Sequence, residues 1–191
     1  MHKLLTEIKK CNICQPFLSH GANPVLSVHS KSKIAIIGQA PGKLVHETGI
    51  PWDDKSGDRL RAWLGVKHDV FYDEEMFALI PMGFCYPGKG KGGDLPPRAE
   101  CAPKWHDMLF SELHEVKLIL LVGIYAQKYY LDNQSMKTLT QTVKNYQQYF
   151  PKYLPLPHPS PRNNIWLKRN SWFTNMLVPE LQKIIKGAIG T

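Results

Sequence analysis

The stretch KIAIIGQAPG, residues 33–42, decides the fold of this chain. Its first five residues form a short apolar run that favours a buried strand, and its last five allow a sharp turn. Similar runs follow at MFALI (76–80), KLILLV (117–122) and YLPL (153–156). Helical patterns lie at 59–64, 101–116, 139–149 and 172–185. The alternation of strands and helices predicts an α/β fold with a mostly parallel sheet.

The composition is that of one globular domain. The chain has 191 residues, of which 43% are hydrophobic and 21% are charged. This length is enough to bury a core without disulfides, so we expect a single domain over residues 1–191. No uncharged apolar run reaches the roughly 18 residues of a membrane span. The first ten residues, MHKLLTEIKK, lack the apolar stretch of a secretory signal, and we expect a cytoplasmic monomer.

The charge balance favours an anionic partner. Twenty-four Lys and Arg residues against 16 Asp and Glu residues give a net charge of +8. A surplus of this size is typical of proteins that bind nucleic acid. A generally basic protein without such a partner has the same charge, so the balance by itself leaves both interpretations open.

The four cysteines, at positions 11, 14, 85 and 101, form a CxxC pair and a second, distant pair. The reducing cytoplasm disfavours disulfides. Four thiolates from two segments suit a tetrahedral zinc or an iron–sulfur cluster. Alternatively, the cysteines are four unrelated buried side chains. The spacing alone does not separate zinc from iron.

Three of the predicted strands end in loops rich in glycine, proline and polar residues, namely GQAPG (38–42), the segment 81–97 and PHPSPRNN (157–164). Parallel α/β sheets bind ligands beyond the carboxyl ends of their strands. We therefore expect a ligand site where these loops meet. GQAPG matches neither a dinucleotide-binding loop nor a phosphate-binding P-loop.

The segment GIPWDDKSGD, residues 49–58, adds an aromatic residue and several carboxylates. Trp52 either stacks on a nucleobase or covers the edge of the core. Asp58 is expected to be either an N-terminal residue or the cap of the helix that begins near Arg59. Asp54 has no such structural role in this interpretation, which makes it a candidate for chemistry.

The loop HPSPRN, residues 158–163, places His158 at the end of the last strand. The prolines on both sides of Ser160 stiffen the backbone. A rigid histidine here is either a donor to a developing anion or a structural residue. Arg162, Lys168 and Arg169 form either a phosphate-binding strip or an ordinary solvated face.

Taken together, these motifs resemble the uracil-DNA glycosylase superfamily, and most closely its two bacterial and archaeal families with a four-iron cluster. The likeness runs from Cys11 to about Asn163. It includes CxxC, GQAPG, GxPW followed by DxSGD, the second cysteine pair and HPSPxN. The order and spacing of these motifs are specific, whereas no single motif is.

The resemblance implies a three-layer α/β/α sandwich with a central four-stranded sheet, and a [4Fe-4S] cluster on the four cysteines. It implies that DNA is the partner and that a base flipped out of DNA binds between the GQAPG and HPSP loops. His158 would donate to the base oxygen, Asp54 would hold the water or stabilise the cationic sugar, and Trp52 would stack on the base. Further implied pocket residues are Gly38, Gln39, Ala40 and Ser160, with Arg162 where the superfamily often inserts a wedge side chain.

Two positions depart from the family pattern. Gln39 stands where one family has glutamate, which leaves Asp54 as the better acid. Pro81 stands where these families have the asparagine that reads the uracil edge, and proline offers neither a side-chain polar group nor a backbone donor. His46 is a weaker candidate for contact with the sugar or base.

These observations predict a glycosylase that hydrolyses the bond between deoxyribose and uracil, or another deaminated or damaged base. The alternative is a catalytically weak or inactive DNA-binding protein with the same fold. A small metal-stabilised hydrolase acting on a nucleotide or nucleoside is a third hypothesis.

Overall fold

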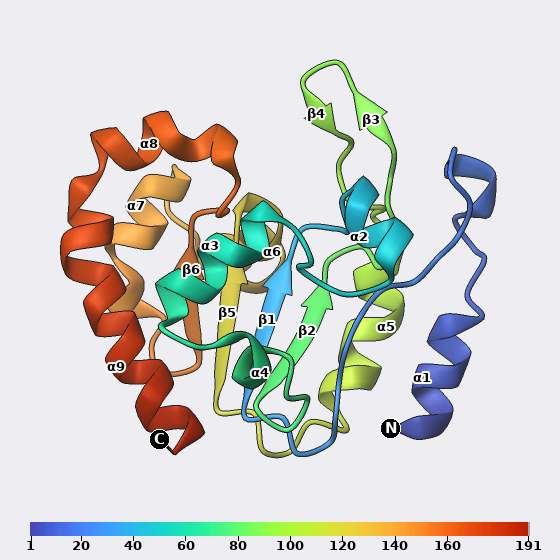
Figure 1. The fold of residues 1–191 in the computed structure, drawn as a ribbon, viewed down its shortest axis with the longest axis horizontal. Helices are drawn as coiled ribbons and strands as arrows, with labels where there is room; N and C mark the ends of the chain where they lie inside the picture. The colour runs from blue at the N-terminus through green and yellow to red at the C-terminus, as the bar shows by residue number, and fades with distance from the viewer. Residues whose placement is uncertain (191) are drawn as a thin grey trace.

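Four parallel strands form the central sheet of the computed structural model, which describes residues 1–190 (Figure 1). The strands are β1 (Ile34–Gly38), β2 (Phe77–Pro81), β5 (Leu118–Val122) and β6 (Tyr153–Leu156). Their order in the sheet is β2-β1-β5-β6. The four apolar runs in the sequence are therefore strands, and the predicted parallel sheet is confirmed.

Helices cover both faces of this sheet. One face packs against α3 (Lys55–Leu64), α4 (His68–Phe71), α7 (Leu139–Lys144) and α9 (Val178–Ile189). The other face packs against α1 (His2–Lys9), α5 (Cys101–Phe110) and α6 (Ile124–Leu131). Successive strand residues point to opposite faces, and the strands are apolar throughout, so both faces of the sheet are apolar. The predicted three-layer architecture is confirmed.

The remaining helical segments are short. They are α2 (Lys43–Thr48), α8 (Asn164–Arg169), a π-helical turn at Phe173–Leu177 before α9, and four 3-10 turns at Gln15–Phe17, Asp132–Gln134, Tyr146–Gln148 and Pro161–Asn163. No helix within residues 1–190 is both long and apolar enough to cross a membrane.

Two predicted helices are shorter in the structure than their apolar patterns. The helix at 101–116 ends at Phe110, and Leu113 is buried from the turn that follows it. The helix at 139–149 ends at Lys144, where a 3-10 turn continues the apolar pattern. In both cases a turn after the helix buries an apolar residue at helical spacing, so the apolar pattern is longer than the helix.

A small hairpin interrupts the segment that the sequence presents as irregular. Its strands, β3 (Lys89–Gly90) and β4 (Gly93–Asp94), are antiparallel and form a sheet of their own. The hairpin stands beyond the carboxyl ends of β1 and β2 (Figure 1). The connection from β2 to α5 thus places a structured element above the edge where ligands bind.

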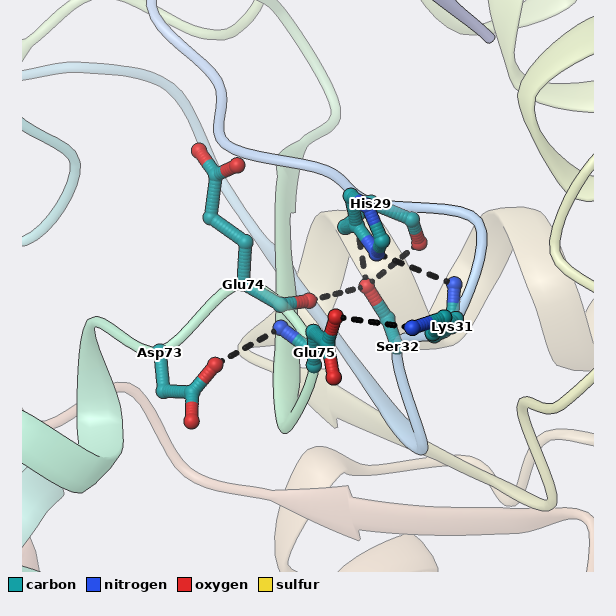
Figure 2. A network of polar contacts seen from close by, with 6 residues as sticks. All are labelled: His29, Lys31, Ser32, Asp73, Glu74 and Glu75. Atoms are coloured by element: carbon teal, nitrogen blue, oxygen red, sulfur yellow. Dashed lines mark hydrogen bonds and ion pairs between the residues drawn. The ribbon is translucent and has the colours of Figure 1, made fainter.

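A polar network joins the turns that precede β1 and β2, at the amino ends of the strands (Figure 2). The fully buried Ser32 hydroxyl lies 2.7 Å from the His29 carbonyl oxygen and 2.6 Å from the Glu74 carbonyl oxygen. Lys31 and Glu75 form an ion pair at 3.2 Å on the surface. This network fixes the starts of two neighbouring strands and lies away from the loops that carry the candidate site.

Candidate functional site

A cavity of about 480 Å³ opens where the GQAPG and HPSP loops face the β3–β4 hairpin. All eight residues predicted for substrate binding and chemistry line this cavity: Gly38, Gln39, Ala40, Trp52, Asp54, His158, Ser160 and Arg162. They come from three separate segments of the chain. The fold therefore gathers the predicted side chains around one space, as expected for loops at the carboxyl edge of a parallel sheet.

The GQAPG loop is fixed by backbone hydrogen bonds to the segment after β2. The Met82 N–H donates to the Gly38 carbonyl at 2.9 Å, and the Gly83 N–H donates to the Gln39 carbonyl at 3.0 Å. A Cβ on Gly38 would lie 2.7 Å from Cζ2 of Trp52. Glycine at the end of β1 is thus what allows the indole to lie against the floor of the cavity.

Trp52 holds its indole in the cavity from an unusual backbone conformation. Its φ is 60°, a region that residues other than glycine rarely adopt. The ring centroids of Trp52 and His158 are 5.8 Å apart, with 33° between the ring planes. Trp52 also packs against the core beneath α3. It therefore covers the edge of the core and lines the cavity at the same time.

Asp54 caps α3, and Asp58 is a residue of its first turn rather than its cap, which is the first of the two roles expected for Asp58. Asp54 Oδ1 accepts a hydrogen bond of 2.8 Å from the Gly57 N–H, while Asp58 lies in the first turn and pairs with Arg61. The helix begins four residues earlier than its apolar pattern because its first turn, KSGD, is polar. Among residues 1–190, Asp54 Oδ2 has no hydrogen-bond partner, which leaves it available to the cavity.

His158 carries its proton on the nitrogen that is available to the cavity. The Ser160 N–H lies 3.2 Å from Nδ1, which makes Nδ1 an acceptor and assigns the proton to Nε2. Burial lowers the pKa of His158, against the opposing effect of Asp54 and Asp94. The Asn163 side-chain amide donates to the His158 carbonyl at 2.7 Å and fixes the loop. At neutral pH this histidine is an oriented neutral donor.

Arg162 connects the HPSP loop to the hairpin. Its Nη1 donates to the Gly92 carbonyl at 2.7 Å, and a Cβ on Gly93 would lie 1.8 Å from the same nitrogen. The guanidinium therefore holds the hairpin tip in this structure. The wedge role that the resemblance suggests for Arg162 stays a prediction, because it requires this contact to open.

Several cavity residues were missed by the sequence analysis, and the most important is Asp94 in β4. Tyr125 and Leu95 also line the cavity, as does Pro81, which the family pattern had already singled out. A hairpin at this position could have been predicted from GKGKGGD (88–94), because two short segments joined by a two-residue turn that contains glycine are typical of a β-hairpin. His46, considered for contact with the ligand, does not line this cavity.

Pro81 is held from below by a buried histidine. His106 Nε2 donates to the Pro81 carbonyl at 3.1 Å, and Nδ1 lies 2.6 Å from the Tyr130 hydroxyl. Burial lowers the pKa of His106 to about 4, so the ring is neutral. The Pro81 carbonyl already accepts this hydrogen bond, and proline has no N–H. Pro81 therefore presents no free polar group to the cavity.

The four cysteines line a second, smaller cavity together. They come from the loop after α1, the loop after β2, and the first residue of α5: Cys11, Cys14, Cys85 and Cys101. Burial raises the pKa of Cys85 to about 11 and that of Cys101 to about 12. Within residues 1–190, no group of three or more His, Cys, Asp or Glu side chains is arranged to hold a single metal ion.

The fold and the first cavity together define an α/β protein with a ligand pocket at the carboxyl edge of a parallel sheet. The family model described as the uracil DNA glycosylase superfamily matches residues 27–182. The chain belongs to the uracil-DNA glycosylase superfamily. The match includes Cys85 and Cys101 but begins after Cys11 and Cys14, so it does not decide whether this protein belongs to the iron–sulfur families.

Proposed function

We propose that this protein is a DNA glycosylase that hydrolyses the N-glycosidic bond of uracil, or of another deaminated or damaged base, flipped out of DNA. Membership of the superfamily supports a glycosylase-like function in general. The observation that carries the proposal is that Trp52, Asp54 and His158 line one cavity. An aromatic face, an acid and an oriented donor are the groups that this reaction requires.

The proposed reaction separates two opposite charges. The bond between C1′ and the base nitrogen breaks, its electron pair leaves with the base, and the sugar becomes cationic. A water oxygen then bonds to C1′, and a proton of that water passes to a carboxylate. Asp54 Oδ2 is the group placed to stabilise the sugar and accept this proton, while His158 Nε2–H stabilises the departing base.

The other cavity residues hold the base and its sugar. Trp52 stacks on the base. Gln39 presents a carboxamide that can donate and accept, and the small residues Gly38 and Ala40 let the base approach the loop backbone. Ser160 and Arg162 contact the DNA backbone at the cavity mouth. The net charge of +8 supports an anionic polymer as the partner.

We also propose that the four cysteines hold a [4Fe-4S] cluster, with zinc as the alternative. The proposal is supported by the four cysteines lining one small cavity from three segments of the chain, because four thiolates gathered in this way suit an iron–sulfur cluster or a tetrahedral zinc. Bound there, the cluster would cross-link the loop after α1, the loop after β2 and α5, and so stabilise the fold rather than perform the base chemistry.

A catalytically weak DNA-binding protein is the second candidate function. It is favoured by the wall at Pro81, where no polar group reads the base, and by Gln39 in place of an acid. This candidate predicts binding to DNA without release of any base.

The deciding experiment incubates the protein with oligonucleotides that carry each deaminated base, followed by alkaline cleavage. Asp54→Asn is the key variant, because asparagine also caps helices and therefore preserves the start of α3. We expect Asp54→Asn to lower the rate of base release by at least about 100-fold, with DNA affinity equal to or above that of the wild type.

Three outcomes would contradict the proposal or redirect it. Equal rates for Asp54→Asn and wild type would remove Asp54 from the chemistry. DNA binding without base release from any oligonucleotide would favour the binding protein. DNA affinity that does not fall with added salt would favour a hydrolase of free nucleotides.

A further inference from the structure

We propose that Asp94 selects bases that carry a ring N–H, by accepting a hydrogen bond from that N–H of the flipped base. In this role the pocket selects bases with a lactam edge, in which a carbonyl lies beside a ring N–H. This inference rests on the proposed function and deepens it, since it names the chemical class of base that the pocket accepts.

The hairpin brings Asp94 to the cavity. Gly92, Gly93, Asp94 and Leu95 all line it, and the Arg162 hydrogen bond to the Gly92 carbonyl holds the tip in place. The Leu95 N–H donates to the Gly88 carbonyl at 2.8 Å, which closes the base of the hairpin. The position of Asp94 is therefore set from both ends of the hairpin.

Asp94 is an exposed residue at the rim of the cavity, and its carboxylate lacks a cationic partner. Its Oδ1 lies 3.5 Å from the hydroxyl of the buried Tyr86. Its Oδ2 lies 3.7 Å from the place of a Cβ on Gly42, at the GQAPG loop. No ion pair involves Asp94 among residues 1–190. The carboxylate therefore has acceptor capacity left for a hydrogen-bond donor on a ligand in the cavity.

A carboxylate beside an N–H donor recognises one pattern on a base edge. His158 Nε2–H donates to a carbonyl oxygen, and Asp94 accepts from a ring N–H. Uracil, hypoxanthine and xanthine present such a carbonyl and N–H side by side, and so do thymine and guanine, so Asp94 separates this group from cytosine and adenine only. Cytosine and adenine instead have an unprotonated ring nitrogen at this position, and its lone pair would face the carboxylate without a proton between them.

Pro81 makes this assignment more specific. At the wall where a side-chain amide would read the base, Pro81 offers no donor and its carbonyl is engaged by His106. Recognition of the ring N–H must then come from another wall of the cavity. Among the cavity residues, Asp94 is on the hairpin side, and its carboxylate also opposes the lowering of the His158 pKa, consistent with its lying near that ring.

The test uses single-stranded oligonucleotides with uracil or N3-methyluracil, which lacks the ring N–H. Single-turnover rates are measured for wild type, Asp94→Ala and Glu75→Gln. The last variant removes one exposed negative charge at the opposite edge of the sheet and is the matched control. We expect wild type and Glu75→Gln to favour uracil by at least about 10-fold, the discrimination of a hydrogen bond to a charged group, and Asp94→Ala to lose most of this preference.

Binding measurements separate this inference from the proposed function. Affinities for the same two oligonucleotides are measured in the Asp54→Asn background, with and without Asp94→Ala. If wild type releases no base but Asp94→Ala still removes a preference for uracil in binding, the glycosylase proposal fails and the Asp94 inference stands. If the ratio of uracil to N3-methyluracil is the same with and without Asp94, in both rate and affinity, the Asp94 inference is overturned.

Discussion

Trp52 shows how a single residue can serve the fold and the site together. Its φ is 60°, and its carbonyl oxygen approaches Gly57 so closely that a Cβ there would lie 1.8 Å away, so this arrangement requires glycine at position 57. Backbone conformations of this kind cost about 1–3 kcal/mol and persist where the surrounding structure enforces them. The strain is consistent with a position selected for where it places the indole.

Replacing this indole tests the proposed stacking. Trp52→Ala should lower the rate of base release from single-stranded DNA by about 5- to 150-fold, the equivalent of about 1–3 kcal/mol of base stacking. Trp52→Phe keeps an aromatic face and should retain most of the rate. Single-turnover rates on one oligonucleotide measure both effects. Similar losses in the two variants would indicate that the indole acts through packing alone.

Asp54 also has a structural role and a proposed catalytic role, one on each carboxylate oxygen. One carboxylate oxygen caps a helix and the other remains available to the cavity. The sequence pattern offered Asp58 as a first-turn residue or a cap, and Asp54 as a candidate for chemistry alone. In the structure the cap is what orients the carboxylate, because it fixes one oxygen and thereby the direction of the other.

At the scale of elements, α5 links the two cavities. It begins at Cys101, which lines the cysteine cavity, and it carries His106, which holds the Pro81 carbonyl beside the pocket. The Phe84 N–H lies 3.4 Å from the Cys101 sulfur, and the Phe84 ring stacks on His106. The end of β2 is therefore held by one helix through both a thiol and an imidazole.

The buried imidazole makes the stability of this link depend on pH. Burial lowers the pKa of His106 from 6.5 to about 4. Below pH 6.5 His106 is protonated in the unfolded chain but stays neutral in the folded chain. The free energy of unfolding therefore decreases as the pH falls towards 4. Between pH 7.5 and pH 5 this amounts to about 2 kcal/mol.

Urea denaturation at the two pH values checks this prediction. His106→Gln can still donate to the Pro81 carbonyl but does not titrate, so its free energy of unfolding should fall by about 2 kcal/mol less than that of wild type. His114→Gln, at an exposed histidine, is the matched control and should behave as wild type. An equal fall in all three proteins would show that His106 does not cause it.

At the scale of the whole molecule, the segment between β2 and α5 belongs to both cavities. It supplies Cys85 to the cysteine cavity and the β3–β4 hairpin to the pocket. A cluster on the cysteines would tie this long connection to the loop after α1. The integrity of the pocket would then depend on a group that takes no part in the reaction.

Loss of the cluster should therefore lower stability and base release together. Cys14→Ser should lose iron and the brown colour of a cluster, and its melting temperature should fall by about 5–15 °C if a few kcal/mol are lost. Ser32→Ala is the control, because it removes a buried hydrogen bond at the opposite edge of the sheet and should leave iron content unchanged. If metal analysis of the wild-type protein finds one zinc and no iron, the cysteines hold zinc and the cluster assignment is wrong.

Much of this structure was predictable because its signals are local. The four apolar strand runs are each buried on both faces of a parallel sheet, so they read as continuous hydrophobic stretches. The motifs GQAPG and HPSP follow two of these strands directly. Their meeting at one cavity follows from the parallel direction of the strands. Helix ends were less predictable, since turns bury apolar residues at helix-like spacing.

The sequence by itself determined the parallel sheet, the meeting of its loops and the identity of the side chains at that edge, because strand direction and loop position follow from patterns along the chain. Only the tertiary structure decided which atoms these side chains leave available. The proton on His158 Nε2, the cap on Asp54 and the place of Asp94 above the pocket each depend on hydrogen bonds that form after folding. The first two bonds join residues only two or three apart, and folding decides them by fixing the local backbone conformation. The third joins Arg162 to Gly92, 70 residues away, and no pattern along the chain reveals such a pair.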